Sequence, residues 1–219
     1  MIRDKVYDNN GNKAVLARVP AEAESVLDVG CGAGSNARRL RESKTDRVII
    51  GLTGSAKEAT EANKYCDAVR VCDLENGLPE LPRSDFDVVI CSHVLEHLCF
   101  PKTLLSDIAA LRPLTLIVAL PNLMYYKYRT RLLIGRFDYE SDGTMDDTHF
   151  RWYTFCTAKQ LLLANGFRIL EATSNSSIPL PIIRKFLPRG LASNLDRLGG
   201  RLSHGLFGYE LLFVATPEA

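Results

Sequence analysis

Residues 26–34 run Val26-Leu27-Asp28-Val29-Gly30-Cys31-Gly32-Ala33-Gly34. The first four are apolar apart from one acid, a pattern typical of a buried strand. Three glycines alternate after them, and Ser35-Asn36 are good residues to begin a helix. A strand, a glycine turn and a helix expose bare backbone N–H groups to a ligand, because glycine has no Cβ and a helix N-terminus carries partial positive charge. We therefore expect an α/β fold with a ligand site at this turn.

The glycine spacing does not fit a dinucleotide-binding turn. The G-x-G-x-x-G fingerprint needs Gly or Ala at its last position, which counted from Gly30 is Ser35. It also expects a ribose-binding acid about 20 residues further on, whereas the second expected strand, residues 47–51, is followed by Leu52-Thr53. The pattern present is Asp28-x-Gly30-x-Gly32-x-Gly34. It resembles motif I of the class I S-adenosylmethionine-dependent methyltransferases.

Two further stretches support this resemblance. Asp85-Phe86-Asp87-Val88-Val89-Ile90-Cys91-Ser92-His93-Val94-Leu95-Glu96-His97-Leu98 is similar to the fourth strand and following turn of the same enzymes. Residues 143–154, which follow Leu120-Pro121-Asn122 and the stretch 131–136, resemble methyltransferases of surface-polysaccharide pathways and MetW-type proteins. The similarity covers nearly the whole chain and is weakest over residues 175–207.

Strand and helix patterns alternate along the chain. Further strands are expected at residues 47–51, 67–72, 85–91, 114–120, 167–173 and 208–216. Ser55 and Glu58 form a predicted capping box for a helix to about Lys64, Pro101 begins another, and Thr157 caps a third that ends at Asn165-Gly166. This alternation predicts an α/β fold, a doubly wound, mostly parallel seven-stranded sheet, in a single domain spanning 1–219. The resemblance implies the Rossmann-like methyltransferase form of that fold.

Two insertions interrupt the alternation. In residues 121–153, tyrosines and arginines are followed by acids, a composition that favours a substrate-facing lid. Residues 175–207 hold five basic residues against one acid, Asp196. This basic insertion could make a peripheral contact with an anionic membrane, but covering the sheet edge is the interpretation we favour. At the N-terminus, Tyr7-Asp8 is expected either to fold over a cofactor or to belong to an ordinary covering segment.

Composition favours a soluble cytoplasmic protein. The formal net charge of the 219 residues is +1, so there is no global case for nucleic-acid or membrane binding. The six cysteines contain no C-x-x-C pair and suit a reducing compartment. The polar start after Met1 indicates no secretory signal, and the longest apolar run, residues 114–120, is far shorter than the ~20 residues that span a bilayer.

The resemblance implies a site for S-adenosylmethionine. Backbone at Gly30, Gly32 and Gly34 would approach its methionine end, and Asp28 would hold its ammonium directly or through water. Asp73, with the Leu74 backbone beside it, would bind the adenine, and Ser92 and His93 would line the methionine side. The family's acid at the end of strand two is absent here, so ribose contacts are expected either to be weaker or to come from Thr53 or Ser55.

Histidines supply the remaining candidates. His93-Val94-Leu95-Glu96-His97 matches the H-x-x-E-H zinc-peptidase pattern, in which histidines four apart on a helix share a face. The same string is common in methyltransferases after strand four, so no metal ligand is assigned. His149, near the end of the lid, is the candidate general base, with anchoring of the lid to Asp146 or Asp147 as the alternative. Arg151 is expected to bind an anionic acceptor or to pair with the acidic stretch.

We therefore predict methyl transfer from S-adenosylmethionine to a small-molecule or carbohydrate acceptor, at oxygen. Cys91-Ser92-His93-Val94 occupies the place where enzymes that methylate base or glutamine nitrogens carry Asn/Asp-Pro-Pro-aromatic. Its absence, with the near-zero net charge, disfavours a nucleic-acid partner. The competing hypothesis is a non-catalytic protein of the same fold that regulates a biosynthetic enzyme, as MetW-type proteins suggest.

Overall fold

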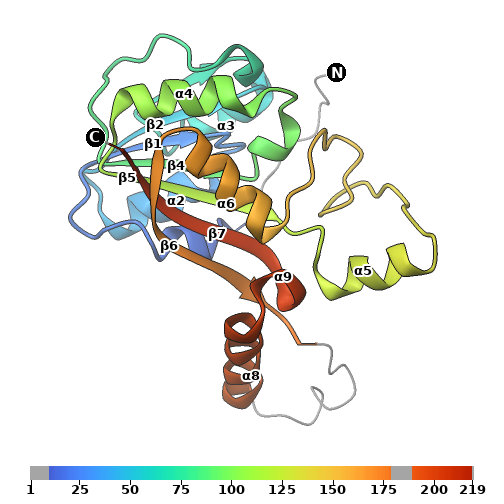
Figure 1. The fold of residues 1–219 in the computed structure, drawn as a ribbon. Coiled ribbons are helices and arrows are strands. Elements are labelled where there is room, and N and C mark those ends of the chain that lie inside the picture. Colours follow the sequence, from blue (N-terminus) through green and yellow to red (C-terminus); the bar gives the residue numbers. More distant parts are fainter. Residues whose placement is uncertain (1–9, 179–188, 219) are drawn as a thin grey trace.

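The computed structural model describes residues 10–178 and 189–218. A seven-stranded sheet forms its centre, in the order β3-β2-β1-β4-β5-β7-β6 (Figure 1). Neighbouring strands are parallel except for β7, which is antiparallel to both β5 and β6. The predicted doubly wound, mostly parallel seven-stranded sheet is confirmed. The strands are β1 (Ser25–Val29), β2 (Val48–Thr53), β3 (Ala68–Val71), β4 (Val88–Ser92), β5 (Thr115–Pro121), β6 (Phe167–Ser176) and β7 (Gly208–Pro217).

The chain reverses its winding direction between β1 and β4. Strands β2 and β3 lie on one side of β1, whereas β4 and β5 lie on the other. Val29 at the end of β1 is in register with Cys91 near the end of β4, so the glycine turn and the segment after β4 emerge at the same edge. Ligands of doubly wound folds bind at such a switch point, outside the carboxyl ends of the strands.

Helices cover both faces of the sheet (Figure 1). Alternate side chains of β1 enter separate cores: Val26 packs with Ala37 and Leu40 of α2, and Leu27 packs in the core that holds Leu104 of α4. This two-sided burial explains why the central strands are continuously apolar. The helices are α1 (Lys13–Leu16), α2 (Ser35–Ser43), α3 (Ala56–Ala62), α4 (Pro101–Leu111), α5 (Tyr126–Leu133), α6 (Phe155–Ala164), α8 (Arg189–Leu202) and α9 (His204–Phe207), with single 3-10 turns η1 (Leu74–Asn76) and η2 (Leu95–His97).

One predicted helix cap is confirmed in part, and another is wrong. Ser55 caps α3 by accepting the Glu58 N–H at 3.4 Å, but the Glu58 carboxylate turns to the Thr53 hydroxyl rather than back to the cap. The predicted cap at Thr157 is wrong by three residues. Thr154 is the N-cap of α6, and Thr157 is its partner in a reciprocal capping box. The helix begins three residues earlier than predicted because the Thr154 hydroxyl already accepts the Thr157 N–H.

The two insertions lie at one end of the sheet (Figure 1). The segment 121–153 carries α5 and a long loop that returns to α6. In the segment 175–207, α8 packs closely on the edge strand β6, since a Cβ at Gly200 would stand 2.4 Å from the Ser176 hydroxyl. The Tyr7-Asp8 prediction and the middle of the basic insertion lie outside the described residues. None of the described helices has the length and apolarity needed to cross a membrane.

The hydrogen bonds of Arg47 allow a test of what stabilises the first half of the sheet. Its side chain is 3% exposed and donates to the backbone carbonyls of Ala23 at 2.9 Å, of Pro20 and Ala21 at 3.3 Å, and of Leu40 at 3.4 Å. We expect Arg47→Met to lower the free energy of unfolding by about 2 kcal/mol, because these acceptors would lose a buried donor.

Urea denaturation measures the effect, with Arg136→Met as the matched control. Arg136 pairs with Asp138 at the surface, where its side chain is 62% exposed. Loss of an exposed pair should change the free energy of unfolding by less than about 0.5 kcal/mol. Equal stability of the two variants would contradict a structural role for Arg47.

Candidate functional site

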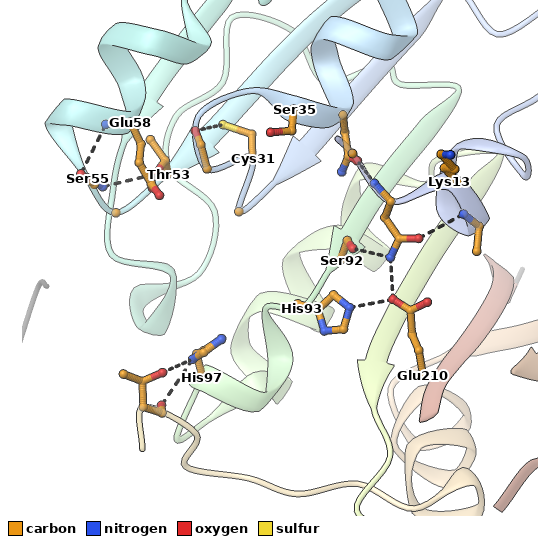
Figure 2. A pocket seen from close by; sticks show the side chains of 18 of the residues that line it. Lys13, Cys31, Ser35, Thr53, Ser55, Glu58, Ser92, His93, His97 and Glu210 are labelled. Atoms are coloured by element: carbon orange, nitrogen blue, oxygen red, sulfur yellow. Dashed lines mark hydrogen bonds and ion pairs between the residues drawn. The ribbon is translucent and has the colours of Figure 1, made fainter. Parts of the chain in front are cut away.

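A cavity of about 710 Å³ opens at the switch point. Six of the residues predicted from the sequence line it, whereas five others do not. Those lining it are Gly30, Gly32, Thr53, Ser55, Ser92 and His93. Those outside the lining are Asp28, Gly34, Asp73, Leu74 and His149. The N-terminal residues 11–14 also face the cavity, as do Glu58, His97 and Glu210, so the site is wider than the predicted set (Figure 2).

The turn after β1 accepts only glycine at its key positions. Gly30, Gly32 and Gly34 have φ values of +72°, +53° and +81°. A Cβ at Gly30 would stand 2.4 Å from Cγ2 of Val94, and one at Gly34 would stand 2.9 Å from the Ala62 backbone. The turn is thus pressed between the segment after β4 and α3, with its backbone facing the cavity. This is the close main-chain approach that the sequence pattern predicts.

Asp28 is a buried acid placed directly before this turn. Its side chain is 1% exposed, and neither carboxylate oxygen has a hydrogen-bond partner among the described residues. Burial raises the pKa of the carboxyl to about 7, and the neighbouring Asn36 side chain limits the rise. A buried carboxylate without a partner is costly. It is suited to a ligand cation, such as the ammonium of an amino-acid tail.

Glu58 of α3 supplies a carboxylate beside the end of β2, where the strand itself has no acid. The Thr53 hydroxyl donates to its Oε2 at 2.6 Å, and both side chains face the cavity beside Ser55 (Figure 2). Glu58 is 6% exposed although it carries a carboxylate. The sequence predicts Glu58 as the second residue of a capping box on this helix, not as a residue of the cavity. A buried carboxylate is therefore present on this side of the cavity, contributed by the helix rather than by the strand.

A hydrogen-bond network closes the opposite wall of the cavity (Figure 2). Glu210 of β7 accepts from Asn12 at 2.6 Å and lies 2.7 Å from Nε2 of His93. The other His93 nitrogen lies 3.2 Å from Oε1 of Glu96. Burial alone would lower the pKa of His93, but hydrogen bonds to Glu210 and Glu96 outweigh it and raise the pKa to about 10. His93 is therefore an imidazolium at neutral pH and cannot act as a general base there.

The peptidase-like arrangement of H-x-x-E-H is not formed. His93 has φ +56°, and the following 3-10 turn η2 begins only at Leu95, so His93 and His97 do not share the face of one helix. Both ring nitrogens of His93 face carboxylates, whereas Nδ1 of His97 faces the lid residue Thr148, 3.0 Å from its hydroxyl. The two histidines thus belong to different networks.

Asp73 and Leu74 begin η1 beyond β3. Asp73 is exposed, and its Oδ1 accepts the Glu75 N–H at 3.0 Å as the N-cap of this turn. The preceding residue, Cys72, donates its N–H to the Thr53 carbonyl at 2.9 Å. The segment that carries Asp73 therefore starts beside Thr53, which lines the cavity. The adenine contact assigned to Asp73 stays a prediction.

His149 lies behind the cavity wall. It is 8% exposed, and its Nδ1 is 3.1 Å from the Thr144 carbonyl. Burial lowers its pKa, so the ring is neutral at pH 7. Its ring centroid is 4.6 Å from that of His97, which does line the cavity. The base role of His149 stays a prediction.

Two lid residues make contacts that the sequence did not indicate. Asp146 Oδ1 accepts from the Thr148 hydroxyl at 2.6 Å, and its backbone carbonyl accepts the His149 N–H at 3.1 Å. The Arg151 guanidinium donates to the Cys99 carbonyl from Nε at 2.9 Å and from Nη2 at 2.6 Å. The Asp146 bonds lie within the lid, whereas the Arg151 bonds tie the end of the lid to the segment after β4.

Comparison with known sequences places the chain in a family. The profile described as "Methionine biosynthesis protein MetW" matches residues 11–172. A ubiquinone biosynthesis O-methyltransferase of Rhodopseudomonas palustris is 29% identical over 143 residues, 64% of this chain and 55% of that protein. An uncharacterized methyltransferase of Mycobacterium bovis is 28% identical over 95 residues, 43% of this chain and 48% of that one. The chain spans about half the length of these curated relatives.

Solved structures share the fold at low sequence identity. A methyltransferase of Haloferax volcanii, in complex with the Trm112 methyltransferase activator, has a TM-score of 0.61 at 22% identity, covering 94% of this chain and 88% of that chain. An S-adenosylmethionine-dependent methyltransferase from Mesorhizobium loti has a TM-score of 0.60 at 18% identity, covering 93% and 95%. Since the family profile matches most of the chain, the predicted resemblance is confirmed: the chain belongs to the MetW family, within the class I S-adenosylmethionine-dependent methyltransferase fold.

Proposed function

We propose that this protein binds S-adenosylmethionine in the switch-point cavity and transfers its methyl group to a hydroxyl oxygen of a small-molecule or carbohydrate acceptor. The observation that carries the proposal is the presence of two buried acids near the glycine turn. Asp28 has no hydrogen-bond partner among the described residues, and Glu58 with Thr53 faces the cavity. An amino-acid tail and a ribose need these two acceptors.

The residues fit such a molecule along its length. The backbone of Gly30 and Gly32 would approach the methionine carboxylate at the N-terminal end of α2, and Asp28 would hold the ammonium. Thr53 and Glu58 would bind the ribose hydroxyls, and Asp73 would accept from the adenine amino group. The sulfonium supplies an activated methyl group, so the protein mainly aligns the acceptor and excludes water.

Oxygen is the proposed acceptor atom. It is supported by the absence of the amine-methylation motif after β4 and by the name of the Rhodopseudomonas relative, an O-methyltransferase. The acceptor would enter beside the lid, where His97 and Thr148 line the cavity.

The second candidate function is a partner protein that regulates a biosynthetic enzyme, and membership of the MetW family is the observation that favours it. Titration calorimetry with S-adenosylmethionine and S-adenosylhomocysteine separates the two. We expect both to bind, the product at least as tightly as the donor. A protein that binds neither would leave the partner function as the better hypothesis. Release of S-adenosylhomocysteine over a panel of hydroxylated acceptors would then identify the substrate class.

The role of Glu58 is tested by Glu58→Gln. Because a charge-assisted hydrogen bond contributes about 1.5–3 kcal/mol, affinity for S-adenosylhomocysteine should fall roughly 10- to 100-fold. Glu61→Gln is the matched control, since Glu61 is an exposed acid on the same helix, paired with Lys64. Equal affinity of the two variants in calorimetry would exclude a ribose contact from Glu58.

The role of Asp28 predicts a pH dependence of cofactor binding. With a pKa of about 7, the carboxyl is protonated in acid and becomes an acceptor for the ammonium only as the pH rises. Affinity for S-adenosylmethionine should increase from pH 6 to pH 8, and Asp28→Asn should weaken binding and remove the increase. The thiols of Cys31, Cys66 and Cys91 around it have pKa values raised by burial and stay neutral over this range.

The same group affects stability with the opposite sign. The folded state keeps the Asp28 proton up to about pH 7, whereas the unfolded chain releases it near the ordinary value of 3.8. The free energy of unfolding should therefore fall as the pH rises from about 4 to 7, by on the order of 3 kcal/mol. Urea denaturation of Asp28→Asn should lack this loss. The exposed control Asp46→Asn should retain it, and a flat wild-type profile would contradict the assignment.

The role of His149 is tested by His149→Gln. We expect turnover to slow by at least about 100-fold, the range of a lost proton-transfer group. Affinity for S-adenosylhomocysteine should stay unchanged, because the ring does not line the cavity. Unaltered turnover in the S-adenosylhomocysteine release assay would remove His149 from the mechanism.

A further inference from the structure

A group of potential metal ligands lies at the acceptor side of the cavity. One ring nitrogen each of His97 and His149 and one carboxylate oxygen of Glu96 lie within 4.8 Å of one another. Glu96 and His97 belong to η2, whereas His149 comes from the end of the lid. Two segments distant in sequence thus bring three donor atoms to one point.

The buried carboxylate of Glu96 is only partly hydrogen-bonded. Its side chain is 0% exposed, and Oε1 faces Nδ1 of His93 at 3.2 Å. The second oxygen, Oε2, has no hydrogen-bond partner among the described residues. Buried charged oxygens are generally paired or coordinate metals. Because two histidines lie beside Glu96, metal coordination is the arrangement that these residues favour.

The hydrogen bonds of both histidines select the tautomer that binds metal. Nδ1 of His149 lies 3.1 Å from the Thr144 carbonyl, which can only accept, so Nδ1 carries the proton. Nδ1 of His97 lies 3.0 Å from the Thr148 hydroxyl, whose own hydrogen is directed to Asp146 at 2.6 Å. Nδ1 of His97 is therefore also the donor.

Since Nδ1 is the donor in each ring, Nε2 is the nitrogen left to bind a cation. Metal-binding histidines usually donate their other N–H to a carbonyl or carboxylate, directly or through a relay, which orients the ring. The Thr144 carbonyl and the Thr148–Asp146 pair supply this second layer for His149 and His97, respectively.

Backbone bonds hold the ligands in place without a metal. The Glu96 carbonyl accepts the N–H groups of Phe150 at 2.9 Å and Arg151 at 3.0 Å. These two bonds join η2 directly to the residues that follow His149. The donor geometry therefore belongs to the fold.

We propose that Glu96, His97 and His149 bind a divalent first-row transition-metal cation of the Zn²⁺ type. Two imidazoles and one carboxylate favour such an ion over Mg²⁺ or Ca²⁺, which prefer oxygen ligands. Three protein ligands leave a position open. Of the three, only His97 lines the cavity, so a water or a substrate hydroxyl would have to reach the ion from the side of His97 and Thr148.

This site would place a Lewis acid where the acceptor enters. A coordinated hydroxyl has a lowered pKa, which prepares it as a nucleophile near neutral pH. With its Nε2 on the cation, His149 would act through the metal, and this role would replace the general-base role. Metal binding itself rests only on the three ligands, whereas its use on an acceptor rests on the proposed methyl transfer. The two claims have separate tests.

Metal titration tests the site. The protein is purified with a tag free of histidine, stripped with a chelator and titrated with Zn²⁺ and with Co²⁺, whose visible absorption reports its ligands. We expect one equivalent of either ion. His149→Gln and Glu96→Gln should each weaken binding at least about 100-fold. His204→Gln, which changes a histidine bonded to Ser174 outside the cluster, should bind like wild type.

Circular dichroism and S-adenosylhomocysteine binding, measured on the same samples, show that each variant is folded. His149→Gln keeps the test decisive if the buried Glu96→Gln variant does not fold. Absence of stoichiometric binding, or equal binding by wild type and His149→Gln, would overturn the metal site even where S-adenosylhomocysteine binds. Metal binding by a protein that fails to bind S-adenosylhomocysteine would support the site and reject the proposed methyl transfer.

Discussion

The absence of space for a Cβ at Gly30 is the constraint on which the site depends. Val94, in the segment after β4, occupies the place that a side chain there would need. Because β1 and β4 are adjacent and in register, this contact fixes the distance between the two walls of the cavity. The left-handed backbone of the turn directs its main chain toward the ligand. Fold and binding surface are thus set by the same contact.

Carboxylates organise the rest of the site. Asp28 has no hydrogen-bond partner among the described residues, Glu58 accepts from Thr53, and the His93 ring lies between Glu210 and Glu96. Each acid is buried, so each needs a cation, a donor or a ligand to offset its loss of hydration. Glu58 and Glu210 line the cavity, whereas Asp28 and Glu96 lie outside its lining.

Family membership and fold narrow the function without completing it. The MetW profile matches residues 11–172, which include the glycine turn, the segment after β4 and the whole lid. The structural neighbours share the sheet at 18–22% identity, a level at which the fold alone is shown. A fold hosts many activities, and chemistry depends on the residues grafted onto it. The Thr53–Glu58 pair and the Glu96–His97–His149 cluster are such residues in this chain.

Local patterns determined much of this protein. Apolar runs, cap residues and the three glycines located every strand of the sheet, because these signals depend only on neighbours in sequence. The resemblance to class I methyltransferases pointed to Gly30, Gly32, Ser92 and His93, and these four residues line the cavity. The same patterns assign Glu58 of α3 to a capping box, because a sequence pattern does not determine the direction in which a side chain points.

Tertiary structure decided which distant residues meet. Asn12 and Glu210 are 198 residues apart, yet they form one hydrogen bond on the cavity wall. His149 joins Glu96 and His97 only because the lid returns to η2. No periodicity encodes such pairs, as they arise from strand order and from the path of an irregular loop. The sequence alone thus determined the sheet and its glycine turn, whereas the charged partners that give the site its chemistry were decided by packing.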